Sequence, residues 1–80
     1  MVYKTSGVCS RAIHFEIEDN KLHGVRFEGG CDGNLKAISK LVEAMDVDKV
    51  IALLEGNTCG PRKTSCADQL TRALKAATQN

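Results

Sequence analysis

The sequence predicts an α+β fold with two layers, in which a three-stranded antiparallel sheet is followed by three helices packed on one face. Apolar residues alternate with polar ones up to residue 28, as they do in half-buried strands. After residue 30 they recur at helical spacing. Because every strand-like segment precedes every helix-like segment, the order β-β-β-α-α-α is indicated, and an interleaved parallel sheet is not.

The first two expected strands are separated by a short loop. Residues 2–5 (VYKT) form the first strand, which ends at Ser6-Gly7. Residues 11–18 form the second, because every other side chain is apolar over this stretch. Its buried face carries Ile13, Phe15 and Ile17.

The second and third expected strands form a hairpin. Asp19-Asn20 is a turn signal between them. In the third strand Val25 and Phe27 point inward, but Leu22 is out of phase with Val25. We predict a β-bulge at Gly24, which restores the register by inserting one extra residue.

Three helices are expected in the rest of the chain. The first has Asp32 or Asn34 at its N-cap and an apolar stripe of Leu35, Ile38, Leu41, Val42 and Met45. The second follows Asp46 as N-cap, ends at Gly56, and carries Val47, Val50, Ile51 and Leu54. The third begins at Ser65-x-x-Asp68, which resembles a capping box, and carries Leu70, Ala73, Leu74 and Ala77.

Length and charge limit the class of protein. Residues 1–80 make one small domain, whose core is marginal and often needs a metal, disulfides or a partner subunit. The formal charge of +1 argues against binding to DNA or RNA through a basic face. We find no apolar segment long enough for a signal peptide or a membrane span, so we expect a cytoplasmic protein whose thiols are kept reduced.

The four cysteines are the candidate functional residues, and all are expected at the ends of secondary-structure elements. They are Cys9, Cys31, Cys59 and Cys66. An even number of thiols at loop positions in a reducing compartment favours a metal site, and zinc is the preferred ion. The start of a helix stabilises an anionic sulfur. Four thiolates on a divalent cation leave an excess of negative charge, which three cations are expected to offset: Arg11, Arg62 and Lys63.

Other interpretations of these residues remain open. The spacing contains no Cys-x-x-Cys pair, so spacing alone does not establish a metal site. A redox dithiol or peroxide-sensitive thiol is an alternative, because Cys66 lies at a helix start close to Lys63, and disulfides or inert thiols are another. Arg62 and Lys63 are equally compatible with holding a phosphate at a helix N-terminus.

At "GGCDGNLKAISKLV" and "CGPRKTSCADQL" the sequence resembles the four-cysteine TSCPD family of small bacterial proteins. All four cysteines coincide with those of that family, and Ala67 stands where the name motif has Pro. The same domain forms the C-terminus of some ribonucleotide reductases, where cysteines of this region are associated with zinc. The resemblance therefore implies a small metal-binding relative of that C-terminal domain, acting with a reductase or another protein partner. The chain is too short to hold the reductase barrel, so we expect no catalysis.

A more distant resemblance is to the IscU/NifU type of iron–sulfur scaffold, on the positions of Cys9, Cys31 and Cys66. It implies an iron–sulfur cluster as the alternative to zinc. The sequence departs from that family at two places. The family has an acidic residue shortly after its first cysteine, where this chain has Ser10 and Arg11, and it has His before its last cysteine, where this chain has Ser65. A fourth thiolate from Cys59 would close the tetrahedron, which favours a permanently held metal over a transferable cluster. A thiol redox protein linked to ribonucleotide reduction is the third hypothesis.

Overall fold

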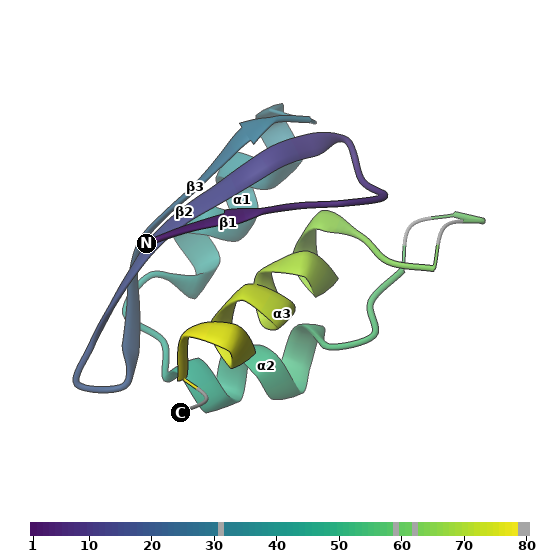
Figure 1. The fold of residues 1–80 in the computed structure, drawn as a ribbon. Coiled ribbons are helices and arrows are strands. Elements are labelled where there is room, and N and C mark those ends of the chain that lie inside the picture. The colour runs from purple at the N-terminus through teal and green to yellow at the C-terminus, as the bar shows by residue number, and fades with distance from the viewer. Residues whose placement is uncertain (31, 59, 62, 79–80) are drawn as a thin grey trace.

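The fold was analysed in a computed structural model, which describes residues 1–30, 32–58, 60–61 and 63–78. Three strands, β1 (Val2–Lys4), β2 (Ser10–Glu18) and β3 (Lys21–Gly29), form an antiparallel sheet in the order β1-β2-β3. Three helices follow, α1 (Asp32–Val42), α2 (Val47–Leu54) and α3 (Cys66–Thr78). The α+β order expected from the sequence is confirmed (Figure 1).

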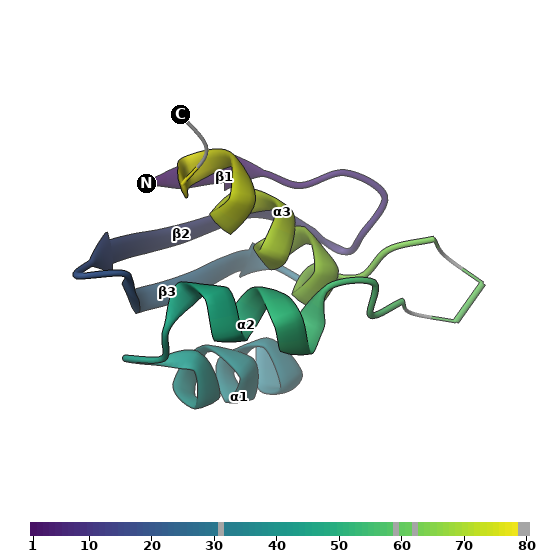
Figure 2. The same ribbon diagram turned by 90° about the horizontal axis from the view of Figure 1, so that it is seen from below.

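The helices form a second layer on one face of the sheet (Figure 2). The core lies between the layers and contains the inward side chains of β2 and β3, together with one face of each helix. Its fully buried members are Ile13, Leu22, Val47, Val50, Leu70 and Leu74. Within the described ranges, no helix has the length and apolar character that crossing a bilayer requires.

The β2–β3 hairpin turns at the two residues that the sequence indicated. Glu18 pairs with Lys21, and the residues between them, Asp19 and Asn20, have φ angles of 53° and 62°. Two successive left-handed residues are typical of a type I′ turn, whose twist matches that of the flanking strands. Asp and Asn tolerate this backbone conformation better than most residues.

The predicted bulge at Gly24 is confirmed. His14 pairs with Arg26 and Glu16 pairs with His23, so one residue of β2 faces two residues of β3. Gly24 adopts φ 62°, a conformation that glycine reaches without steric cost. A second irregularity, between Ser10 and Ala12, was not predicted.

Two predictions about α1 are wrong. The helix begins at Asp32, so neither Asp32 nor Asn34 is its N-cap. Leu41, which we assigned to the apolar stripe, is 75% exposed. The helix turns Leu35 and Val42 toward the core, and Leu41 is rotated by about 100° from Val42 because successive residues are that far apart around a helix.

The ends of α2 agree with the sequence, with one qualification. Asp46 occupies the N-cap position but makes no side-chain capping hydrogen bond; its carboxylate instead lies 3.5 Å from Lys21 Nζ. Gly56 follows the last turn with φ 79°, as expected of a residue that ends a helix.

The bulge allows a direct test of backbone strain. We expect Gly24→Ala to lower the free energy of unfolding by about 1–2 kcal/mol, because an L-residue is disfavoured at positive φ. A Cβ at Gly24 would meet nothing within 4 Å, so steric overlap does not contribute. The matched control is Gly33→Ala, at an open position in α1, which should raise stability by up to about 1 kcal/mol. Equal effects of the two substitutions in urea unfolding would contradict this explanation.

Candidate functional site

Two of the four cysteines lie together. Cys9 is in the loop between β1 and β2, and Cys66 is the first residue of α3, as the sequence predicted. Their sulfur atoms are 3.9 Å apart. Cys9 is exposed, whereas Cys66 is 8% exposed. The predictions for Cys31, Cys59 and Arg62 concern residues outside the described ones.

The two sulfurs border a cavity of about 450 Å³ between the start of α3, the start of α1 and the segment after α2. The cavity wall combines apolar and small polar side chains, namely Val8, Asn34, Ala37, Ile38, Asn57, Thr58, Ser65 and Ala67. Gly30 lies against Cys9, since a Cβ at Gly30 would be 3.1 Å from Cys9 Sγ. The expectation that glycine leaves room beside a sulfur therefore applies at this position.

Ser10 provides a polar contact to the buried thiol. Its hydroxyl oxygen is 3.2 Å from Cys66 Sγ, and the residue is 4% exposed. A hydroxyl donates to a thiolate but accepts from a neutral thiol. Ser10 can therefore hydrogen-bond to Cys66 whether Cys66 is a thiolate or a neutral thiol.

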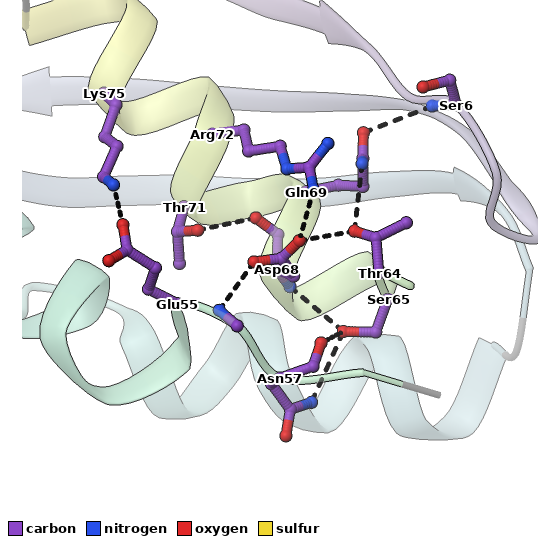
Figure 3. A network of polar contacts seen from close by, with 11 residues as sticks. Ser6, Glu55, Asn57, Thr64, Ser65, Asp68, Gln69, Thr71, Arg72 and Lys75 are labelled. Carbon is purple, nitrogen blue, oxygen red and sulfur yellow. Dashed lines mark hydrogen bonds and ion pairs between the residues drawn. The ribbon is translucent and has the colours of Figure 1, made fainter. Parts of the chain in front are cut away.

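The turn that leads into α3 is built from buried polar side chains (Figure 3). Ser65 Oγ accepts the Asp68 backbone N–H at 3.1 Å, which is the first half of the predicted capping box. The same hydroxyl donates to the Asn57 carbonyl oxygen, so the cap also fixes the segment that follows α2. Cys66 is thus held at the helix start by the residue before it.

Asp68 is the charged centre of this turn. It is 4% exposed, and its carboxylate accepts the Gly56 N–H at 2.7 Å and the Thr64 hydroxyl at 2.5 Å, with Arg72 Nη2 at 3.2 Å (Figure 3). Burial by itself would raise the pKa of Asp68, but the hydrogen bonds from Thr64 and Gly56, together with Arg72, hold that pKa below its ordinary value. The carboxylate is therefore charged at neutral pH.

Gln69 connects the turn to the loop that carries Cys9. Its amide nitrogen donates to Thr64 Oγ1 at 3.1 Å, and its amide oxygen accepts the Ser6 N–H at 3.2 Å (Figure 3). Gln69 is 1% exposed, so these contacts are shielded from water. One side chain thus fixes the two sulfur-bearing segments relative to each other.

Of the three cations expected to offset sulfur charge, the two that the structure describes lie at the surface. Arg11 is exposed and its guanidinium lies over Gly29, while Lys63 is exposed in the segment before α3. Across the described ranges, no group of three or more His, Cys, Asp or Glu side chains is arranged to hold a metal ion. The roles of Arg11 and Lys63 stay predictions.

Comparison with known proteins identifies the family. The family model described as TSCPD domain matches residues 1–78. The chain belongs to the TSCPD domain family. No curated protein and no solved structure is significantly similar to it. The resemblance to iron–sulfur scaffolds remains a prediction.

Sequence reasoning missed Ser10, Thr64 and Gln69, and it assigned Asp68 only to helix capping. A signal for Thr64 and Asp68 is present, since polar residues four apart at a helix start are neighbours on one face. Ser10 and Gln69 carry no such signal, because their partners are distant in the chain.

The lowered pKa of Asp68 predicts an acid-dependent contribution to stability. A carboxyl group with a folded-state pKa below its unfolded value stabilises the fold above the unfolded pKa. That stabilisation is lost as the pH falls through the folded-state pKa. We expect Asp68→Asn to lower the unfolding free energy by about 1–3 kcal/mol at pH 7, and the deficit to shrink below about pH 4. Asp19→Asn, in the exposed turn, is the control.

Urea unfolding of these proteins between pH 7 and pH 3 gives the measurement. A deficit in Asp68→Asn that stays constant over this range would show that the charge of Asp68 does not stabilise the fold.

Because Gly30 lies against Cys9, adding a methyl group at Gly30 is predicted to lower the stability of the fold strongly. In Gly30→Ala the new Cβ would be 2.8 Å from Leu35 Cδ1 and 3.2 Å from the Ser10 backbone nitrogen, at a φ of 81°. We expect a loss of about 2–4 kcal/mol from strain and overlap together. Gly60 has a similar backbone (φ 56°), but a Cβ there would meet no atom of the described residues within 4 Å, so Gly60→Ala should lower the free energy of unfolding by about 1–2 kcal/mol. Thermal or urea unfolding that ranks Gly60→Ala as the worse variant would contradict the packing argument.

Proposed function

We propose that Cys9, Cys31, Cys59 and Cys66 bind one zinc ion, and that this TSCPD domain is a non-catalytic metal-binding module. The 3.9 Å between Cys9 Sγ and Cys66 Sγ carries the proposal. In a tetrahedral site with Zn–S bonds of about 2.3 Å, two sulfurs lie about 3.8 Å apart. The pair therefore has the spacing of two ligands of one ion.

The sequence neighbours of the other two cysteines support the proposal. Gly30, which precedes Cys31, lies against Cys9 Sγ. Thr58, which precedes Cys59, lines the same cavity as Cys9 and Cys66. Chain connectivity therefore makes it feasible for all four thiols to reach one ion, because consecutive Cα atoms are about 3.8 Å apart.

A bound ion would act as a cross-link in a domain with a small core. Cys9 and Cys66 are separated by 57 residues, and closing a loop of that length removes about 4 kcal/mol of unfolded-state entropy in the chain-entropy model. The Ser10 hydroxyl would donate to the Cys66 thiolate, and Arg11, Arg62 and Lys63 would offset the remaining negative charge.

The biological role that we propose is that of a cytoplasmic relative of the C-terminal domain of ribonucleotide reductase. Such a domain would act with a reductase or another protein partner. An iron–sulfur scaffold is a competing function, and the scaffold hypothesis requires a site from which the cluster can leave.

One observation favours a second function, thiol redox chemistry. Cys9 is exposed, and Cys66 lies behind it at 3.9 Å with little solvent access. An accessible thiol beside a buried one is the arrangement of an attacking and a resolving cysteine. In such a protein Cys9 would react with the oxidant or partner disulfide, and Cys66 would complete the intramolecular disulfide.

Elemental analysis of anaerobically purified protein tests the proposed centre, with a purification tag that binds no metal. We expect one zinc per chain and a colourless solution. Cys9→Ser and Cys66→Ser should each lose the stoichiometric metal and fall in stability, since a structural zinc supplies folding free energy. Ser10→Ala is the matched control, and should retain zinc with about 10-fold weaker binding.

Other outcomes would assign a different function. Brown protein containing iron, in which Cys59→Ser still holds a cluster, would favour the scaffold. Metal-free protein whose thiols react with a disulfide reagent without denaturant would favour the redox function.

A further inference from the structure

The outer edge of β3 carries an inference that is independent of the cysteines. In the sheet formed by the described residues, β3 has a strand partner on one side only, and nine residues is long for an edge strand. Natural proteins usually protect such edges, because their backbone groups pair readily with another chain. The parts of this edge that the chain leaves uncovered therefore indicate where another chain can pair with β3.

The chain covers the edge near the start of β3. The Leu22 N–H donates to the Met45 carbonyl at 2.9 Å, and the Ala44 N–H donates to the Leu22 carbonyl at 2.7 Å. The connection between α1 and α2 therefore takes the place of a neighbouring strand at Leu22.

Glu43 extends this cover to the bulge. Its carboxylate accepts the Gly24 N–H at 2.9 Å and lies 2.7 Å from His23 Nδ1. The backbone hydrogen bond from Gly24, and then His23, hold the pKa of Glu43 below its ordinary value. Glu43 thereby anchors the segment after α1 to β3 at Gly24.

Beyond Gly24 a groove separates β3 from α1. We call it the β3–α1 groove; it encloses about 390 Å³ and is lined by Val25, Arg26, Phe27, Gly29, Leu35, Lys36, Ser39 and Lys40. Its floor is apolar, since Val25 and Leu35 are 8% and 6% exposed. Among the lining residues that the structure describes, three are cationic and none is acidic. Helix α1 contacts β3, the strand of the sheet beside which it lies in Figure 1.

We propose that the β3–α1 groove binds an extended acidic peptide of a partner protein, which adds to the sheet as a fourth strand beside β3. Main-chain hydrogen bonds to a sheet edge supply affinity in this mode of recognition, and side-chain pockets supply specificity. Residues 25–29 span about 17 Å. The 11 residues of α1 span about 16 Å. The groove therefore accommodates a segment of about five residues.

The cations specify the spacing of acidic residues in the peptide. Lys36 and Lys40 are one helical turn apart, so their Cβ atoms are about 6 Å apart on one face of α1. Side chains at positions i and i+2 of an extended peptide are about 7 Å apart on one face of the strand. Two carboxylates separated by one residue match that spacing.

A small anion is the competing ligand, because three cations around a cavity also attract phosphates. It would use the charges but not the edge of the strand. Hydrogen bonding to the edge of β3 therefore distinguishes a peptide from a small anion. N-methylation of the peptide backbone tests this hydrogen bonding, because it removes amide donors without changing the charge.

The test uses the full chain and the fluorescein-labelled peptide Glu-Val-Glu-Val-Glu, blocked at its other end. Anisotropy should show binding that weakens at least 10-fold in Lys36→Glu/Lys40→Glu, and at least 10-fold with an N-methylated peptide. Lys49→Glu, an exposed charge reversal on α2, is the matched control and should leave binding within 2-fold. Amide chemical shifts should change at residues 25–29 and 35–40.

Several results would overturn the proposal. They are equal binding of Lys-Val-Lys-Val-Lys, shift changes outside the groove, and unchanged binding of the N-methylated peptide. Inorganic pyrophosphate that binds more tightly than the peptide and displaces it would assign the groove to a small anion instead. The metal content of the protein is expected to be the same in all these variants, so this test is separate from that of the cysteine site.

Discussion

The buried carboxylate of Asp68 is the constraint on which the arrangement of this domain depends. A charge this deeply buried is costly unless every oxygen is hydrogen-bonded, and the partners of Asp68 come from two segments of the chain. Gly56 belongs to the end of α2, and Thr64 to the entry into α3. A single charged group therefore holds Gly56 and Thr64 close to each other.

The same polar network relates the fold to the candidate site. Through Gln69 it reaches the β1–β2 loop, so the segments that carry Cys9 and Cys66 are also held together by contacts that do not involve the sulfurs. Physical roles can thereby be given to the residues of the motif after which the family is named. Thr64 and Asp68 orient the turn, Ser65 caps the helix, and Cys66 occupies the first helical position. Ala67 replaces the proline of the motif with a residue that also suits a first turn.

The fold could be predicted because strand, turn and helix signals are local in the sequence. Contacts between distant segments could not be predicted from the sequence. Gly24 could be identified as a bulge because the alternation of apolar residues breaks on either side of it. Leu41 could not be placed, because an apolar residue at the border of a helical stripe faces solvent or core depending on which way the helix is rotated. The position of Cys66 followed from helix signals, but its approach to Cys9 depends on tertiary contacts such as that of Gln69.

The long sequence separation between Cys9 and Cys66 has a consequence for biosynthesis. The hairpin and its contacts with α1 are complete within the first half of the chain, whereas Cys66 begins the last helix. A ribosome adds residues at about 5–20 per second, from the N-terminus onward. Until the segment that forms α3 has been synthesised, Cys9 therefore lacks its neighbour. During that interval Cys9 meets oxidants and metal ions without the second thiol that the folded site provides.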